Sequence, residues 1–496
     1  MAAASGAFIE GPVPGRLKVI HGFGGLAFGV KDSGFSFFLL LFYNQVLGMP
    51  AATVSLALLV ALLVDAVIDP ILGNLSDRTY TRWGRRLPWL YAAPIPLAFA
   101  WIALWTPTGG EVPTFWELLG IAVVVRLLLS ACEVPSVSLL PEITADYDER
   151  TTLFRYRYLF GWLGGAIMMV LAYTVFMGGE NGLLRAEGYW PFALTGAIIM
   201  AVSVLGSALG QHKMAAHLPA VRPPPFTIKA AFEEIFSAFR EPAFLIFAAG
   251  GLAAYVSQGI TFSISNYLTV FVWRLDATAL PGLPEGATAL MIYPLVLFLS
   301  VVAMFLIVGP LHRRFGKPAT AAIGAIVSLV FLVAPYLLLL AGAWPQVGTL
   351  ASAMLYYALL LVANCMGVVM MISASSMVAE IVEAHLERTG RRAEGAFYSG
   401  NWLIQKCATG LGIFVTGLIV STAGLDAGAD PAAIPTVAIE RMIWLYAILM
   451  AVLALSAAYW LGRFPIGREQ HEARLALLAE MARSQEVDPE DRVSRL

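Results

Sequence analysis

Twelve apolar stretches, each long enough to cross a lipid bilayer, follow one another along this chain of 496 residues. A helical crossing needs about 20 residues. We place the stretches at 20–47, 51–74, 88–108, 115–140, 154–178, 189–210, 242–273, 287–311, 319–341, 349–378, 396–423 and 437–461. Only 13% of residues are charged, against about 25% in soluble domains. The sequence therefore predicts an all-α membrane protein with twelve transmembrane helices.

Basic residues indicate the orientation, because cytoplasmic loops accumulate Lys and Arg. Apart from Lys31, Arg126 and Lys406, which lie inside apolar stretches, the basic residues fall almost entirely on one side, and only Arg185, Arg274 and Arg441 lie on the other. We therefore expect both termini in the cytoplasm and a multi-pass protein of a plasma membrane, the bacterial inner membrane. No cationic leader precedes the first stretch, so a cleaved signal peptide is not expected. The net charge of −2 offers no basic face for nucleic acid.

Two loop motifs occur twice. The first follows the fourth stretch and returns after the tenth; its copies are Glu142-Ile143 with Glu149-Arg150-Thr151, and Glu380-Ile381 with Glu387-Arg388-Thr389. The second follows the second stretch and returns after the eighth; its copies are Arg82-Trp83-Gly84-Arg85 and Arg314-Phe315-Gly316-Lys317. Because both copies of each motif lie on one side, the repeated unit holds an even number of helices, here six. Chance matching of basic loop residues is the alternative.

The repeat predicts four segments. Residues 1–210 and 242–461 are two halves of six helices each, residues 211–241 a cytoplasmic middle loop, and residues 462–496 a cytoplasmic tail. In the tail, Leu475, Leu477, Leu478 and Met481 have helical spacing, which favours a short amphipathic helix.

Ionisable side chains inside transmembrane helices cost about 2.5–3.5 kcal/mol each and usually face a cavity or a partner. Seven stand out here: Lys31, Asp32, Asp65, Asp69, Arg126, Glu133 and Lys406. The four-residue spacing of Asp65 and Asp69 places both carboxylates on one helix face. Two adjacent buried anions need a cation, which is Na⁺, a shared proton or the ammonium of Lys406. These are three stages of one coupling cycle, or else a permanent salt bridge joins the second and eleventh helices.

The carboxylate pair is present in the first half only. The corresponding positions of the second half are Leu297 and Val301. A single aspartate motif argues against an intramembrane enzyme that holds Mg²⁺-diphosphate between two such motifs. We therefore expect that the protein is not an enzyme and that it needs no cofactor. No ATP-binding loop motif is evident, so an Na⁺ or H⁺ gradient is the expected energy source.

A second polar set has the chemistry to bind a hydroxyl-rich ligand, which carboxylates and arginine hold through paired hydrogen bonds beside an aromatic ring. Asp32, Arg157 and Trp162 supply these groups, with Lys31 and Glu133 nearby. The alternatives are a lipid-headgroup or loop contact for Arg157 and plain packing for Trp162. Arg126 and Glu133 share a helix face, and we favour structural pairing with other helices for both.

Several of these residues resemble the signature of the glycoside-pentoside-hexuronide:cation symporters, a family of the major facilitator superfamily. The matching motifs are Asp65-Ala66-Val67-Ile68-Asp69-Pro70, Gly73, Ser76-Asp77-Arg78-Thr79, Arg82-Trp83-Gly84-Arg85-Arg86, Phe28-Gly29-Val30-Lys31-Asp32, Val134-Pro135, Ser138-Leu139, Pro141, and the segment from Gly395 to Lys406. The resemblance implies the major facilitator fold and a cation-coupled sugar symporter that works by alternating access.

The resemblance also implies roles for single residues. Asp65 and Asp69 become the cation carboxylates and the metal ligands if the ion is Na⁺. Lys406 becomes their coupling partner, and Asp32 and Arg157 belong to the substrate site. The implied cytoplasmic gate holds the halves together when the site faces outward; its residues are Asp77, Arg78, Arg82, Arg85, Arg86, Glu142, Arg150, Glu380 and Arg388.

Two positions depart from a well-known member of that family. Ile68 stands where that member has an asparagine. This change removes one oxygen ligand for Na⁺, so it weakens the case for Na⁺ as the coupling ion and leaves H⁺ open. Our alignment also places Ser130 where that member has a sugar-holding aspartate. The helix-two and helix-eleven pattern is shared with vertebrate lysophosphatidylcholine symporters.

The predicted function is therefore symport of a sugar or glycoside with a monovalent cation. A lysophospholipid or other amphiphile is the alternative substrate, and a non-transporting receptor or scaffold with the same fold is a further alternative. Expected partners are the small solute and the lipid bilayer, and the presence of both halves in one chain predicts a functional monomer.

Overall fold

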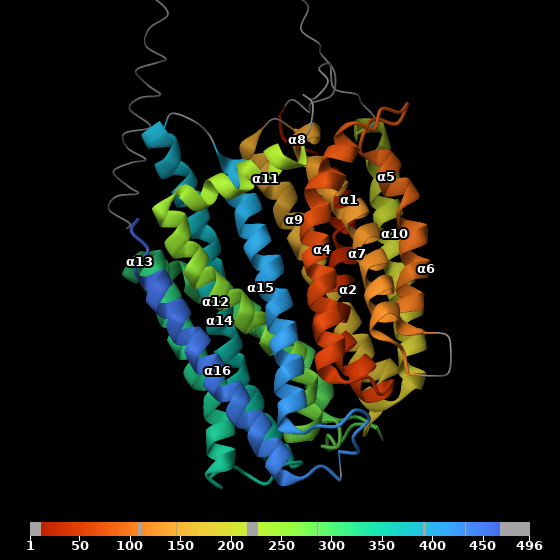
Figure 1. Ribbon diagram of the computed structural model, residues 1–496, viewed down its shortest axis with the longest axis vertical. Helices are drawn as coiled ribbons and strands as arrows, with labels where there is room; N and C mark the ends of the chain where they lie inside the picture. Colours follow the sequence, from red (N-terminus) through yellow and green to blue (C-terminus); the bar gives the residue numbers. More distant parts are fainter. Residues whose placement is uncertain are drawn as a thin grey trace, which may run out of the picture.

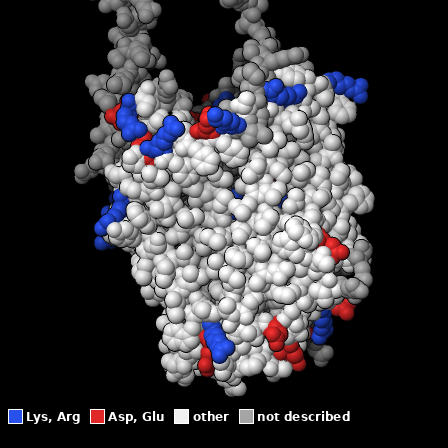
Figure 2. Space-filling model, viewed as in Figure 1, with Lys and Arg blue, Asp and Glu red and all other residues white. Residues whose placement is uncertain are grey.

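The structure is a computed structural model that describes residues 11–107, 112–144, 146–215, 227–284, 286–389, 393–431 and 433–466. Its regular elements within these ranges are helices. They form two groups that stand side by side with their axes roughly parallel (Figure 1). On the face drawn in Figure 2, the charged side chains gather toward the two ends and leave a largely uncharged band between them. That band is what the hydrocarbon region of a bilayer requires.

The first group contains the N-terminal helices. Its α-helices are α1 Gly15–Phe23, α2 Leu26–Ser33, α3 Leu39–Leu41, α4 Ala51–Asp77, α5 Leu87–Ala92, α6 Pro94–Trp105, α7 Phe115–Ser138, α8 Leu140–Ile143, α9 Tyr147–Leu171 and α10 Tyr189–Ala215. Its π-helical and 3₁₀ segments are η1 Gly34–Phe38, η2 Phe42–Val46, η3 Ala172–Phe176, η4 Gly182–Leu184 and η5 Ala186–Gly188.

The second group contains the C-terminal helices. Its α-helices are α11 Ile228–Ser237, α12 Pro242–Tyr267, α13 Tyr293–Leu340, α14 Leu350–Thr389, α15 Glu394–Ala423 and α16 Thr436–Gly462. Its shorter segments are η6 Ala238–Arg240, η7 Leu268–Val272 and η8 Ala289–Ile292. Helix α11 occupies part of the predicted middle loop, whose Arg222–Pro225 run lies outside the described residues, as does the tail beyond residue 466.

Ten helical segments of the described chain are long and apolar enough to cross a membrane, and α6 is a shorter apolar helix. One segment, α13, contains two crossings. Ser300 and Ser328 donate to the carbonyls of Leu361 and Ala363, two neighbouring points on α14. A straight helix would hold these serines about 42 Å apart, so the chain reverses at the non-helical Gly316. Together with α5 and α6 as one broken crossing, the described chain is consistent with twelve.

The two loop motifs adopt matching structures. Gly84 and Gly316 both have left-handed backbone, with φ of 82° and 77°, a conformation that glycine adopts without a steric penalty. Beside these turns, Arg85 pairs with Glu142 and Lys317 pairs with Glu380, both at 2.7 Å. The sequence repeat is thus also a repeat of structure. We call the side of the molecule that carries these loops the basic end, and the other side the opposite end.

Glycines allow the helices that carry the site to pack closely. A Cβ atom at Gly29 would lie 1.8 Å from the carbonyl oxygen of Gly161, where α2 crosses α9. The equivalent crossing of the second half, α12 with α15, brings Gly412 within 2.5 Å of the Val256 carbonyl by the same measure. Small residues at such crossings let the backbones approach, as is common in membrane helices.

The two halves meet along α4 and α15, and at the opposite end. A Cβ atom at Gly417 would lie 2.0 Å from Ser55 Oγ, so α4 and α15 nearly touch there. Asn266 on α12 donates to the carbonyl of Phe37 at 2.8 Å and accepts from Tyr173 at 2.7 Å. Tyr267 donates to Asn44 at 2.9 Å. These contacts close the opposite end.

Candidate functional site

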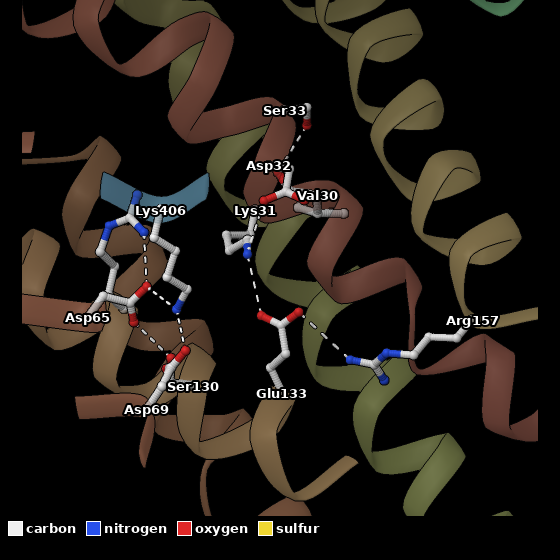
Figure 3. Close-up of polar contacts among 11 residues, drawn as sticks. Val30, Lys31, Asp32, Ser33, Asp65, Asp69, Ser130, Glu133, Arg157 and Lys406 are labelled. Carbon is white, nitrogen blue, oxygen red and sulfur yellow. Dashed lines mark hydrogen bonds and ion pairs between the residues drawn. The ribbon is translucent and has the colours of Figure 1, made fainter. Parts of the chain in front are cut away.

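The carboxylates of Asp65 and Asp69 lie together on α4 and face α15 (Figure 3). Lys406 on α15 donates to Asp65 Oδ2 at 2.8 Å and to Asp69 Oδ2 at 2.5 Å. The four-residue spacing of the aspartates produces this shared face, as expected for a helix. One ammonium from the second half therefore bridges two carboxylates of the first half.

Asp65 has two further partners, both on α7. Arg126 Nη1 lies 3.4 Å from Asp65 Oδ2, and the Ser130 hydroxyl donates to Asp65 Oδ1 at 2.8 Å. The Arg126 guanidinium also lies over the ring of Phe35, 4.4 Å from its centroid. Two carboxylates and two cations make the cluster electrically neutral. Within the described chain, Asp69 Oδ1 is buried and accepts no hydrogen bond, so it is the carboxylate oxygen best placed to take a further ligand.

A second charged cluster lies beside the first (Figure 3) and joins α2, α7 and α9. Lys31 lies 3.0 Å from Asp32 and 3.4 Å from Glu133, and Glu133 lies 3.9 Å from Arg157. Arg157 donates to Ser136 at 2.7 Å. This cluster is also neutral, and it presents both acceptors and donors in a small space.

Three side chains at this second cluster are exposed. The Asp32 side chain is 70% exposed, and Tyr158 and Trp162 on α9 are 60% and 58% exposed as residues. Tyr158 interacts electrostatically with Glu133 and Arg157, and Trp162 lies one turn further along the same helix face. An exposed carboxylate, a phenol and an indole beside a buried arginine are the groups that hold a hydroxyl-rich ligand.

The structure divides the polar side chains of α7 between the two clusters. Our alignment gives Ser130 as the counterpart of a sugar-holding aspartate, and in the structure Ser130 donates to Asp65 in the cation cluster. The carboxylate that faces Lys31 and Arg157 is Glu133. Arg126 and Ser130 are four residues apart and both contact Asp65. Glu133, about one turn further along α7, contacts Lys31 and Arg157 instead. The i,i+4 spacing of Arg126 and Ser130 was the sequence signal for this division.

The predicted gate residues lie at the basic end. Asp77 is 3.2 Å from Arg85 and also pairs with Arg86, and both arginines contact Glu142. Three further contacts at the basic end join Arg150 with the Thr144 carbonyl, Lys317 with Glu380, and Arg388 with Glu241. Arg82 stacks on Trp83, and Arg78 ends α4. These ion pairs stabilise each half separately.

Fold and buried charges together define a multi-pass membrane transporter. The pattern of the MFS/sugar transport protein family matches residues 20–468, and the chain belongs to that family. The predicted fold class and the prediction that the chain is a transporter and not an enzyme are thereby confirmed.

Named relatives agree with this placement. An uncharacterized symporter of Synechocystis, sll1374, is 28% identical over 90% of this chain and 94% of its own length. The isoprimeverose transporter of Lactiplantibacillus pentosus is 35% identical over 38% of this chain and 40% of its own. The crystal structure of a D-xylose-proton symporter superposes with a TM-score of 0.62 at 14% identity, covering 91% of this chain and 98% of that one. At this identity the superposition shows the fold alone.

Proposed function

We propose that this protein carries a sugar or glycoside across the bacterial inner membrane together with Na⁺ or H⁺. The observation that carries the proposal is the bridge from Lys406 to Asp65 and Asp69, which joins the two halves through charge. An incoming cation at Asp69 neutralises the carboxylate whose ion pair in the described part of the chain is with Lys406. Lys406 is then released, and the attraction between α4 and α15 changes with the occupancy of the site.

Arg126 gives the two aspartates different roles. Its guanidinium is always charged and stays beside Asp65, so Asp65 keeps a counterion when Lys406 leaves. Asp69 has no second cation partner among the described residues and therefore carries the exchange. Both Asp65 and Asp69 line the site, and Ser130 offers a neutral oxygen beside them.

The solute binds at the second cluster in this proposal. Asp32 and Glu133 accept hydrogen bonds from hydroxyl groups, Lys31 and Arg157 donate them, and Trp162 with Tyr158 packs against the sugar face. Lys31 shares Glu133 with Arg157 and lies on the side of the second cluster that is nearer the cation cluster in Figure 3. Solute that binds Glu133 therefore competes with Lys31.

The closed opposite end and the exposed Asp32 side chain support an inward-facing arrangement, with the basic end and both termini in the cytoplasm. The two halves rock about the midplane site, as is typical of this architecture. The gate residues Asp77, Arg78, Arg82, Arg85, Arg86, Glu142, Arg150, Glu380 and Arg388 then exchange partners between the halves when the site faces outward. One chain contains both halves and acts as a monomer.

Uptake into proteoliposomes tests the proposal. Labelled glycosides, hexuronides and lysophospholipids are offered with an imposed Na⁺ or H⁺ gradient in separate runs. We expect sugar uptake with one gradient, lost in Asp65→Asn and Asp69→Asn and retained in Glu117→Gln, which keeps the α7 capping box intact. Uptake of lysolipid alone would make the sugar assignment of Asp32 and Arg157 wrong. Uptake of none of these solutes would overturn the sugar assignment.

A further inference from the structure

Gln45 binds the backbone of the other half at the opposite end. Its side-chain amide donates to the carbonyl of Asp426 at 3.1 Å, and its side-chain oxygen accepts from the amide of Ala429 at 3.0 Å. Gln45 lies in η2, where the first crossing ends, and is only 5% exposed. The loop that it holds follows α15, the fifth crossing of the second half.

Asp276 makes the reverse contact. Its carboxylate oxygen Oδ2 accepts from the backbone amide of Asn181 at 3.1 Å, and the residue is 2% exposed. Asp276 follows η7, where the first crossing of the second half ends. Asn181 follows η3, where the fifth crossing of the first half ends.

The two contacts are equivalent under the repeat of the halves. In each case, a side chain after the first crossing of one half binds backbone after the fifth crossing of the other half. Both first crossings end in a π-helical turn, η2 and η7, a feature that often marks functional positions. We infer that Gln45 and Asp276 are paired latches that set the equilibrium between the closed and open states of the opposite end.

Backbone geometry supports a docked, constrained state at the Asp276 latch. Among the described residues, Asn181 and Arg274 are the non-glycine residues with positive φ, at 57° and 51°. Both belong to the two segments that this latch joins. Such conformations are uncommon for non-glycine residues and persist where surrounding contacts hold them, so opening of the latch releases constraint in both halves.

The two latches differ in chemistry. Gln45 is neutral at every pH, whereas Asp276 is a buried acid with no ion pair within 4 Å in the described part of the chain. Charged residues of the two latch segments are Arg274 on its own loop, and Glu180, Arg185 and Glu187 on the loop that it binds. Burial raises the pKa of Asp276, and hydrogen bonds from backbone amides oppose that shift.

This inference rests on the proposed alternating-access function, but its test needs no substrate. Spin labels replace Glu187 in the first half and Leu283 in the second, both exposed, in a chain whose three cysteines are replaced by alanine. Pulsed electron–electron double resonance then reports the distribution of distances between the two labels across the opposite end. Tyr189→Phe is the matched control, because it removes a buried hydrogen bond to Leu183 within one half.

Loss of the latch bonds should shift the distribution toward long distances. For Gln45→Ala we expect the open-to-closed ratio to rise about tenfold, because two partly buried hydrogen bonds, to the Asp426 carbonyl and from the Ala429 amide, are lost together. Asp276→Ala should exceed Asp276→Asn by about fivefold, since the asparagine oxygen still accepts from Asn181 while both variants are neutral. The control should match the parent.

Two results would overturn the inference: distributions that do not change in Gln45→Ala, or equal distributions in Asp276→Ala and Asp276→Asn. Either result with sugar uptake intact rejects the latches and leaves the proposed function standing. A shift in the distances in the latch variants, without uptake of any solute by the parent protein, supports the latches and rejects the proposed function.

Discussion

Charge balance in the cation cluster makes a prediction about stability. Asp65 and Asp69 oppose Arg126 and Lys406, so the cluster sums to zero. Lys406→Met leaves one uncompensated negative charge, and Asp69→Asn leaves one uncompensated positive charge. The double variant is neutral again, because Arg126 still faces Asp65. The double variant should therefore lose less stability than the sum of the losses of the two single variants.

The magnitude follows from burial. Removal of one partner of a buried ion pair costs about 3–5 kcal/mol. We take the lower end, about 3 kcal/mol, because the Lys406 and Asp69 side chains are 25% and 22% exposed. At about 2 °C per kcal/mol, each single variant should lower the apparent Tm by about 6 °C. The double variant should recover at least about half of the summed loss.

Thermal unfolding in detergent, followed by intrinsic fluorescence, provides the measurement. Lys229→Met is the matched control; Lys229 is 85% exposed and pairs with Glu233 one turn along α11, so no change in Tm is expected. If the double variant loses the full sum of the two single losses, the aspartate and the lysine do not compensate each other and the reasoning is refuted.

The same variants identify the coupling ion. In Lys406→Met the carboxylate pair lacks its ammonium, so an added cation that binds the folded state should restore Tm in proportion to the logarithm of its concentration. Restoration by Na⁺ at constant pH indicates sodium, and restoration only on acidification indicates a proton. A Tm that responds to neither would contradict the assignment of Asp65 and Asp69 as the ion site.

Three further predictions concern packing, pH and the hydroxyl partner. Gly29→Ala should abolish folded expression, because its Cβ would lie 1.8 Å from the Gly161 oxygen, whereas Gly120→Ala, with no atom within 4 Å, should express normally by size-exclusion chromatography. The closed opposite end buries Asp276 and raises its pKa, so that state binds the proton more tightly. The open fraction in the spin-label assay should therefore rise with pH, from about 3.9, the ordinary aspartate pKa, to the raised value, and Asp276→Asn should show no such rise. Ser130→Ala should weaken cation-dependent stabilisation about fivefold, since Asp65 loses its neutral donor; unchanged cation titrations would exclude Ser130 from the ion site.

The sequence alone determined the features that depend on local pattern. Apolar length marks a crossing because an unsolvated backbone must form a helix in lipid, and basic loops mark one side of the membrane. The duplicated motifs located the two loops that contain Gly84 and Gly316, whereas their ion pairs within each half came from the structure. Helical periodicity was enough to place Asp65 and Asp69 on one face, since i,i+4 neighbours adjoin in any α-helix. The end of α14 was missed: residue 378 was predicted, whereas the helix continues to Thr389, because hydropathy detects the bilayer and not the helix.

Only the tertiary structure decided which charges meet. Arg126 and Glu133 share a helix face, yet one binds Asp65 and the other binds Lys31 and Arg157, because they lie at different depths against different helices. The depth and rotation of those helices depend on close crossings such as that of Gly29 with Gly161. The latches at Gln45 and Asp276 have no local signal, since each binds a backbone group far along the chain. Contacts of this kind depend on how the two halves pack, and the periodicity of a single helix does not determine that packing.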